Sequence, residues 1–408
     1  MRILIYSAYY EPEKAASLYL STELYEGLAK SGCIVDLFVP MPTRGIDKET
    51  RKHYKSKKNE KKCNGNLRIH RISLFRESKS IVLRAIRYIL MNIFFILKSL
   101  TVKADLIFVQ STPPTQGLMA AIIKKIKHIP FVYNLQDVFP DSLVGLGMTD
   151  EKSLIWRIGK KIESITYQNA DKIIVISDAI RDNIRQKGVP NHKIHKIYNW
   201  VNTENVFPVK KEENPIYERY KIEKDKFNIV YAGNLGYAQN IEAILNIAYE
   251  LRSNEDIRFI IFGEGAQKQY YIETASEKGL SNITFLPLLP YNEVSYVYSL
   301  GDLCMLTCKK GFGKSAMPSK MWNIMACGSP VLAIFDSESD VEHIVKDENI
   351  GYFVDAEGYL EAVEIIDKAK ENKKELIEKG KNARMVVEKK YCSQMAVKKY
   401  CDIILKVK

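Results

Sequence analysis

The chain has 408 residues, more than a single hydrophobic core usually organises, so we expect two domains. Hydrophobic residues make up 46% of the sequence and charged residues 27%, which is typical of a folded globular protein and excludes a disordered chain. The seven cysteines are scattered, and Cys304 and Cys308 lack the second pair that would complete a zinc site. Since the opening MRILIYSAYY also lacks the parts of a secretory signal peptide, we expect free thiols in a reducing cytosol.

The formal net charge of +12 is concentrated in the first half of the chain. Residues 1–203 carry +15 and the remaining residues carry −3. The densest basic segment is KETRKHYKSKKNEKK, Lys48 to Lys62, which we interpret as a loop. A basic half indicates an anionic partner, either a membrane surface, nucleic acid or phosphates, although a solvated loop explains this segment equally well.

Strand-like and helix-like segments alternate along the first half. Helical spacing runs from Ser17 to Ser31 and stops at Gly32. Short apolar runs predict strands at Arg2–Ala8, Cys33–Val39, Ala104–Gln110, Phe131–Leu135 and Lys172–Ser177.

The segment Ser80–Leu100 departs from this alternation. It is long enough to span a bilayer, but polar residues interrupt it, and each arginine near a bilayer centre costs about 2.5–3.5 kcal/mol. Arg84 and Arg87 share a helix face, so we expect a helix in the membrane interface with both cations toward anionic headgroups. We expect Phe94 and Phe95 to belong to its apolar surface. An ordinary packed helix is the alternative.

The alternation restarts after the polar segment 197–215. Apolar runs there predict strands at Phe227–Ala232, Arg258–Phe262, Asn282–Leu286, Asp302–Thr307, Val331–Phe335 and Gly351–Val354. Two series of strands separated by helices indicate an α/β protein with two doubly wound, Rossmann-like domains, 1–203 and 204–390, and a cleft between them. Ligands of such sheets bind at the carboxyl ends of the strands.

Two loops of the first half follow predicted strands. In SAYYEPEKAAS, small residues open a helix whose free amides could receive a phosphate. In NLQDVFPDS, Asp137 follows a buried strand directly, where a carboxylate could orient or deprotonate a hydroxyl nucleophile. A turn cap before Pro140 is the structural alternative for Asp137.

Three loops of the second half offer phosphate or sugar contacts. In YAGNLGYAQN, the glycines allow close approach to a ligand, and we expect Asn240 to cap the helix that follows. In GEG, Glu264 could accept a hydrogen bond from a sugar or base. In MPSKMWNIMACGSPV, Pro318 suits a first helical turn, while Ser319 and Lys320 add a hydroxyl and a charge, which makes this stretch the strongest diphosphate candidate. The chain contains no Asp-x-Asp, so we expect no metal or other cofactor.

With these motifs, the sequence resembles the retaining glycosyltransferases of family 4, which have the GT-B fold. The resemblance covers nearly the whole chain, and its stretches are YYEPEKAAS, STPPTQG, NLQDVFPDS, IYNWVN, YAGNLGYAQN, FGEG and PSKMWNIMACGSPV. The last is the most specific. The sequence is most similar to a bacterial surface-polysaccharide branch that includes N-acetyl-L-fucosaminyl transferases of O-antigen synthesis.

The resemblance implies a nucleotide-sugar donor, UDP-linked, held by the C-terminal domain, and a polyprenyl-diphosphate-linked saccharide acceptor held by the N-terminal domain. It also implies that the helix of residues 391–408 packs back on the N-terminal domain. The basic first half and the segment Ser80–Leu100 predict a peripheral position on the cytoplasmic face of the plasma membrane. The sequence lacks interleaved basic and aromatic residues, so we expect no nucleic acid partner. The catalytic candidates are Asp137 and Lys320. The donor-binding candidates are Ala15, Ala16, Gly233, Asn234, Gly236, Gly263, Glu264, Leu288, Pro318, Ser319, Lys320 and Asn323. The acceptor-side candidates are Glu13, Lys14, Gln136 and Asp137.

The sequence departs from the family at two pairs of positions. Ser315 and Asn323 stand where relatives often carry acidic residues, and Asn234 and Asn240 stand where they often carry arginine and lysine. Lys320 is therefore the first candidate for stabilising the diphosphate, and Asn323 for a hydrogen bond to the ribose. Two alternatives are a UDP-sugar epimerase of the same fold and a non-catalytic module that binds anionic lipid or nucleic acid.

Overall fold

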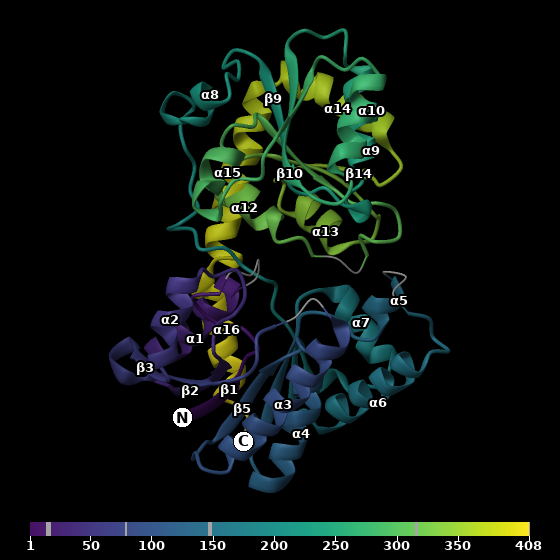
Figure 1. The fold of residues 1–408 in the computed structure, drawn as a ribbon. Coiled ribbons are helices and arrows are strands. Elements are labelled where there is room, and N and C mark those ends of the chain that lie inside the picture. The colour runs from purple at the N-terminus through teal and green to yellow at the C-terminus, as the bar shows by residue number, and fades with distance from the viewer. Residues whose placement is uncertain (14–17, 78–79, 146–148, 315–316, 408) are drawn as a thin grey trace. The chain divides into compact units, whose positions relative to one another are not determined.

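The structure is a computed structural model that describes residues 1–13, 18–77, 80–145, 149–314 and 317–407 (Figure 1). The chain divides into two compact units, one of Met1–Tyr198 with Ala396–Lys408 and one of Asn199–Met395. Each unit contains one predominantly parallel β-sheet with helices packed on it.

The N-terminal unit contains an eight-stranded sheet in the order β3-β4-β2-β1-β5-β6-β7-β8. Its strands are β1 (Arg2–Tyr6), β2 (Ile34–Pro40), β3 (Asn59–Lys62), β4 (Leu67–Ile72), β5 (Leu106–Gln110), β6 (Phe131–Leu135), β7 (Lys172–Val175) and β8 (Ile194–Lys196). Its helices are α1 (Leu18–Lys30), α2 (Lys48–Ser56), α3 (Ile81–Ser99), α4 (Thr115–Lys127), α5 (Asp141–Gly145), α6 (Leu154–Asn169) and α7 (Asp178–Gln186). All neighbouring strands are parallel except β3 and β4, so the carboxyl ends of β4, β2, β1 and β5 meet at one edge.

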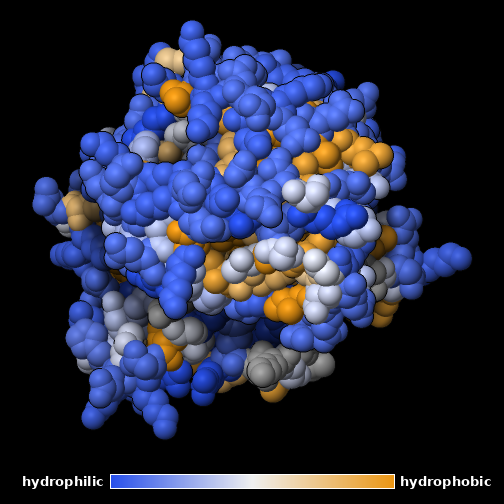
Figure 2. Space-filling view, turned by 90° about the horizontal axis from the view of Figure 1, so that it is seen from above, coloured by the Kyte–Doolittle hydropathy of each residue, from blue (hydrophilic) through white to orange (hydrophobic). Residues whose placement is uncertain are grey.

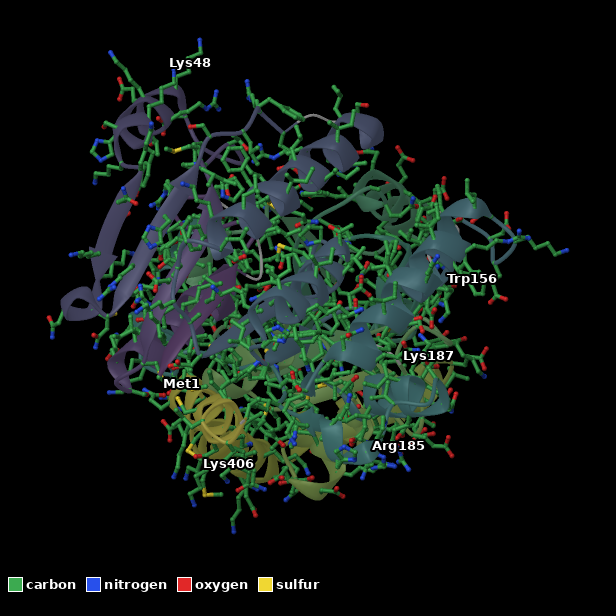
Figure 3. The ribbon with its side chains drawn as sticks, turned by 90° about the horizontal axis from the view of Figure 1, so that it is seen from below. Met1, Lys48, Trp156, Arg185, Lys187 and Lys406 are labelled. Carbon is green, nitrogen blue, oxygen red and sulfur yellow. The ribbon has the colours of Figure 1, made fainter. Side chains whose placement is uncertain are left out.

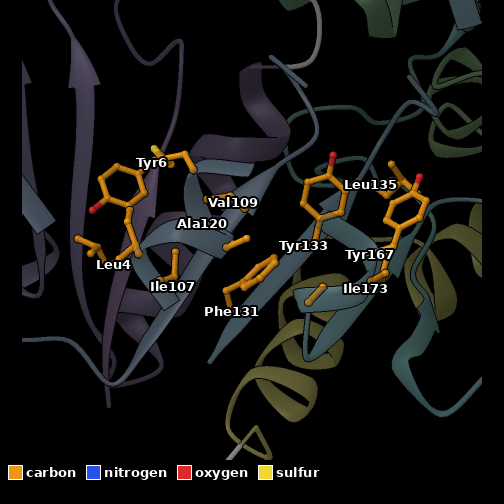
Figure 4. Packing of buried hydrophobic residues seen from close by; sticks show 14 of the residues in the cluster. Leu4, Tyr6, Ile107, Val109, Ala120, Phe131, Tyr133, Leu135, Tyr167 and Ile173 are labelled. Carbon is orange, nitrogen blue, oxygen red and sulfur yellow. The ribbon is translucent and has the colours of Figure 1, made fainter. Parts of the chain in front are cut away.

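Both faces of this sheet are covered, as a parallel sheet requires. On one face, buried side chains of α3, α4 and α6 pack against Leu4, Ile107 and Phe131 of the strands (Figure 4). On the other face, Tyr400 of the last helix, α16 (Ser393–Ile404), lies with its ring 6.1 Å from that of Phe108. The hydroxyl of Tyr400 donates to Oδ1 of Asn134 over 3.0 Å, which ties the end of the chain to this sheet.

The basic segment Lys48–Lys62 is not a loop, and that prediction is wrong. It contains helix α2, which Asp47 begins by accepting a hydrogen bond from the amide of Thr50, and strand β3. No residue of α2 is buried, and Lys48 lies at the periphery of the unit (Figure 3). The lysines of the segment are solvated, but a tertiary strand pairing gives it a fixed structure.

The segment Ser80–Leu100 is helical, but two of its expected membrane-facing residues are buried. Phe95 is fully buried and Arg87 is 2% exposed, whereas Phe94 is 43% exposed. Arg87, Met91 and Phe95 are spaced by four residues, so they share the helix face that packs on the sheet. The predicted outward orientation of Arg87 and Phe95 is therefore wrong. Among the helices of the described ranges, none is long and apolar enough to cross a bilayer.

The C-terminal unit contains a six-stranded parallel sheet in the order β11-β10-β9-β12-β13-β14. Its strands are β9 (Phe227–Asn234), β10 (Ile257–Glu264), β11 (Ile283–Leu286), β12 (Leu303–Thr307), β13 (Val331–Phe335) and β14 (Gly351–Asp355). Its helices are α8 (Ile216–Arg219), α9 (Ile241–Glu250), α10 (Lys268–Glu277), α11 (Val294–Tyr298), α12 (Lys320–Ala326), α13 (Asp340–Asp347), α14 (Tyr359–Glu371) and α15 (Lys373–Lys390). Strands β9 and β12 are central, so their carboxyl ends and the loops that follow form the middle of one sheet edge.

The face drawn in Figure 2 is largely hydrophilic, and its hydrophobic residues gather in separate patches. All seven cysteines are free thiols, and only Cys63 is not buried.

Candidate functional site

A lysine and two glycine loops meet at the carboxyl ends of β9 and β10. Gly233, near the end of β9, has φ +149°, and a Cβ built on it would lie 3.1 Å from Nζ of Lys320. That backbone conformation is rare for residues with a side chain, so only glycine leaves room there for the lysine. The start of helix α12, which follows β12 in the chain, therefore lies next to the end of β9.

Lys320 has neutral partners only, as far as the described residues show. Its Nζ donates to the hydroxyl of Tyr231 over 2.9 Å and lies 4.2 Å from the centre of that ring. The hydroxyl of Tyr231 donates in turn to the carbonyl of Asn234 over 2.9 Å. Burial without an anionic partner lowers the pKa of Lys320 to about 8. The amine is therefore protonated at neutral pH but loses its proton only slightly above it, and a bound anion would raise its pKa and hold the proton there.

The second glycine loop supports the first. A Cβ at Gly263 would lie 2.6 Å from Cγ of Leu235, and one at Gly265 would lie 2.4 Å from the carbonyl oxygen of Leu235. The glycines of GEG thus let the chain leave β9 across the end of β10, a packing role that sequence reasoning did not assign. Glu264 is exposed and accepts a hydrogen bond from Nζ of Lys268 over 2.7 Å.

The asparagines of YAGNLGYAQN shape this loop. Nδ2 of Asn234 and the amide of Gly236 each donate to Oε1 of Gln239 over 3.2 Å. Asn240 adopts a left-handed conformation with φ 51°, and its Nδ2 donates to the carbonyls of Cys308 and Ala356. Its side chain does not cap α9, so that prediction is wrong, because the left-handed residue turns its amide toward those two carbonyls instead.

The remaining donor-side candidates lie in or just before helix α12, except Leu288, which follows β11. Ser319 is its exposed N-cap residue, Pro318 is half-buried, and Gly328 follows its end with φ +67°. Asn323 is only 9% exposed, and its Oδ1 accepts from the hydroxyl of Tyr291 over 3.4 Å. Leu288 is 47% exposed. The structure thus brings Lys320, Gly233 and Asn234 together around Tyr231, whereas Asn323 is held largely away from solvent.

The second group of candidates lies in the N-terminal unit, after β6. The amides of Gln136 and Asp137 donate to Oγ of Ser111 over 3.0 and 3.2 Å, and the hydroxyl of Ser142 donates to Oδ2 of Asp137 over 3.1 Å. Asp137 as a residue is exposed, but its neighbours partly desolvate the carboxylate and raise its pKa above the usual value. Asp137 is therefore an accessible carboxylate with an anchored backbone.

Glu13 is placed differently from Asp137. It is 5% exposed, and its Oε1 accepts hydrogen bonds from the amides of Thr43 and Arg44 over 2.7 and 2.9 Å. Burial raises the pKa of this carboxyl. Glu13 therefore fixes the loop after β2. Lys14, Ala15, Ala16 and Ser315 lie outside the described residues.

Sequence reasoning missed three partners of these candidates, Tyr231, Tyr291 and Ser111. Tyr231 and Ser111 lie inside the motifs YAGNLGYAQN and STPPTQG. Tyr231 belongs to strand β9, and Ser111 directly follows strand β5. Their place in these motifs was the available signal for them.

Two family models match the chain, "Glycosyltransferase Family 4" over residues 20–205 and "Glycosyl transferases group 1" over residues 213–386. The chain is 25% identical over 365 residues to the probable glycosyltransferase WbjE of Pseudomonas aeruginosa, covering 90% of this chain and 86% of WbjE. It superimposes on the crystal structure of Anabaena HepE in complex with UDP with a TM-score of 0.70 and 14% identity, covering 99% of this chain and 100% of that one. For WaaG, a glycosyltransferase involved in lipopolysaccharide biosynthesis, the TM-score is 0.71 at 14% identity, with 99% and 100% covered.

Two Rossmann-like sheets with this topology, matched over their full length by such structures, define the GT-B fold. Since the two family models together account for most of the sequence, the chain belongs to glycosyltransferase family 4. The predictions of the fold and of the enzyme class are confirmed. The family models therefore favour a glycosyltransferase over the two alternatives, an epimerase and a non-catalytic binding module.

Proposed function

We propose that this enzyme transfers a sugar from a UDP-linked donor to a hydroxyl of a polyprenyl-diphosphate-linked saccharide during the synthesis of a bacterial surface polysaccharide, with retention of configuration. The C-terminal unit holds the donor and the N-terminal unit holds the acceptor. HepE, solved with UDP, supports the nucleotide, and WaaG, which acts in lipopolysaccharide biosynthesis, supports the pathway class. N-acetyl-L-fucosamine is the donor sugar to test first.

The observation that carries this proposal is Lys320 beside Gly233 and Tyr231. Departure of UDP builds negative charge on the diphosphate, and a cation fixed beforehand stabilises that charge more than mobile water does. Lys320 is partly buried, bound to neutral partners and titrates near pH 8, so the arriving diphosphate would raise its pKa and hold it protonated. Asn234 and Asn240 supply no charge, which leaves this role to Lys320.

On the acceptor side, Asp137 would orient the attacking hydroxyl, with Gln136 beside it. The leaving diphosphate, rather than a separate strong base, would accept the proton of the attacking hydroxyl. The carboxylate of Asp137 is positioned through Ser111 and Ser142, and the residue is exposed, so a substrate hydroxyl could donate to this carboxylate.

Contact with the membrane would bring the enzyme to its lipid-linked acceptor. The outward face of α3 exposes large apolar side chains by 41–58%: Leu83, Ile86, Ile89, Leu90, Ile93, Phe94 and Leu97. The start of α6 exposes Leu154, Ile155 and Ile158, and Figure 3 shows Trp156 of the same helix at the periphery. Apolar residues on two helices of a basic unit are typical of proteins that lie on an anionic bilayer surface.

The test is a transfer assay with purified enzyme, a panel of UDP-sugars and a GlcNAc-diphosphate-lipid acceptor. We expect UDP release that depends on the acceptor and a product one sugar longer. Conversion of the donor without any acceptor would contradict transfer. The variant Lys320→Ala should lose donor binding, and its retention of full activity would remove the lysine from the mechanism.

A further inference from the structure

We propose that a basic groove in the N-terminal unit binds the diphosphate group of the lipid-linked acceptor, and that the isoprenoid chain leaves the groove over the exposed face of α3. This inference rests on the proposed function, because it specifies where that acceptor is held. Among the described residues, the acceptor-side candidates Glu13, Gln136 and Asp137 do not line the groove, and Lys14 lies outside the described residues.

The groove consists of two cavities that share residues. The larger has a volume of about 690 Å³ and is lined by Tyr9, Thr43, Arg44, Arg76, Glu77, Arg84, Tyr88 and Thr112. The smaller, of about 250 Å³, is lined by Met41, Pro42, Thr43, Arg51, Lys55, Ser73, Leu74 and Arg76. Thr43 and Arg76 line both cavities, so the two lie side by side.

The topology of the sheet explains why these residues meet. Tyr9 follows β1, Thr43 and Arg44 follow β2, Arg76 and Glu77 follow β4, and Thr112 follows β5. These four strands are neighbours and run parallel, so the segments after them gather at one edge. This is the edge at which open α/β sheets bind ligands.

The charges of the groove fit a diphosphate. Arg44, Arg76 and Arg84 line the larger cavity, and within the part of the chain that the structure describes none of them forms an ion pair. Arginine has a planar fork of donors that matches phosphate oxygens, and a diphosphate diester carries a negative charge on each phosphoryl group. Arg51 and Lys55, on the otherwise unexplained helix α2, add positive charge from the second cavity.

Hydrogen bonds connect three residues of the groove lining, Tyr9, Glu77 and Tyr88. The hydroxyl of Tyr9 donates to Oε1 of Glu77 over 3.0 Å and lies 2.8 Å from that of Tyr88. Glu77 is the carboxylate among the described lining residues, and its Oε1 is engaged by a tyrosine. Glu13 fixes another part of the lining by accepting from the amides of Thr43 and Arg44, and the guanidinium of Arg44 lies 5.3 Å from the centre of the Tyr9 ring.

The apolar neighbour of the groove distinguishes a lipid diphosphate from a free anion. Helix α3 places Arg84 and Tyr88, one turn apart, in the cavity wall. The same turns expose Ile86, Ile89 and Leu90 by 41–54%. One helix thus offers a cationic seat and, beside it, an apolar surface onto which a prenyl chain could pack.

The experiment compares Arg76→Gln with Arg185→Gln, an exposed arginine of the same unit that lies far from Lys48 and α2 (Figure 3). In the transfer assay, we expect Arg76→Gln to raise KM for the GlcNAc-diphosphate-lipid acceptor by about tenfold or more and to leave KM for the UDP-sugar unchanged. Arg185→Gln should change neither. An unchanged acceptor KM in Arg76→Gln would overturn the inference.

Direct binding separates this inference from the proposed function. Wild-type protein should bind farnesyl diphosphate more tightly than farnesyl monophosphate or inorganic pyrophosphate, and Arg76→Gln should weaken that binding about tenfold. If the wild type binds farnesyl diphosphate in this way but transfers no sugar, the proposed function fails and the groove stands. If Arg76→Gln binds farnesyl diphosphate normally but no longer binds phosphatidylglycerol vesicles, the groove contacts lipid headgroups and the inference is wrong.

Discussion

Replacing Lys320 by methionine should stabilise the protein at neutral pH while weakening donor binding. The ammonium is costly to bury because Tyr231 offers it only a hydroxyl and a ring. Methionine keeps an unbranched apolar stem and removes the charge. Tyr231 keeps a partner in the variant, since its hydroxyl donates to the carbonyl of Asn234.

The size of the gain follows from the pKa of Lys320. Burial lowers that pKa from 10.5 to about 8. Each unit of pKa difference between the folded and unfolded states is worth about 1.4 kcal/mol, so burying the ammonium costs at most about 3.5 kcal/mol below pH 8. Because the side chain keeps some contact with water, we expect the variant to gain about 1–2 kcal/mol, or several degrees in the Tm of the C-terminal unit.

The pH dependence of the stability gain shows whether the buried ammonium of Lys320 causes it. A lysine whose folded pKa is lowered costs stability fully below that pKa, and the cost disappears as the pH rises toward the unfolded value. The advantage of Lys320→Met should therefore fall by about half between about pH 7 and about pH 9.5. Denaturant unfolding at both pH values measures it.

Lys309→Met is the matched control, because Nζ of Lys309 pairs with Oε1 of Glu242 at 2.9 Å in the same unit. This variant should be neutral or less stable than the wild type, with no gain at either pH. A Lys320→Met protein that is less stable than the wild type by the same amount at both pH values would refute the reasoning.

Four further predictions concern Lys320, Gly233, Asp137 and helix α3. The Kd for UDP should be flat below about pH 8 and rise above it, and Lys320→Arg should remove this rise; calorimetry at several pH values checks it. Gly233→Ala should cost about 1–3 kcal/mol of unfolding free energy and weaken UDP binding, since the new Cβ meets Nζ of Lys320 in a strained backbone; equal stability would contradict the crowding. Asp137→Asn should lower kcat by about tenfold to a hundredfold without changing the Kd for UDP, and a changed Kd would move Asp137 to the donor side. Phe94→Ser should release the protein from anionic vesicles with its fold intact, whereas Phe95→Ser should unfold it; intact binding by the folded Phe94 variant would exclude α3 from the membrane contact.

Local signals predicted the sheets well. The buried strands are short apolar runs, such as Phe131–Leu135, and a parallel strand buried on both faces is apolar whatever its neighbours are. Strand β3 has the sequence NEKK and no such pattern. It is a strand because it pairs with β4, so it could not be found from composition.

The errors at α3 and α9 have the same origin. Arg84 and Arg87 are close on a helical wheel, but the stripe that packs runs through Arg87, Met91 and Phe95, and only the sheet beneath decides which stripe that is. Asn240 precedes a helix, yet its left-handed backbone directs its side chain to carbonyls of two other loops.

The candidate site was predicted in part. Lys320 and Gly233 were recognised from a helix start and a glycine loop, because both are local signals. The contact between Lys320 and Tyr231, which are 89 residues apart, depends on the order of the strands. The basic groove depends on segments after four strands, so its arginines could not be grouped from the sequence.

The central claim is that Lys320 gains a proton when it binds the donor diphosphate. Titration of UDP at about pH 9, in two buffers of different ionisation enthalpy, measures that proton directly. With a free pKa of about 8, we expect uptake close to one proton by the wild type and none by Lys320→Met, whose Kd should be at least about tenfold weaker. Equal Kd values for the two proteins, with no proton uptake by the wild type, would contradict the account.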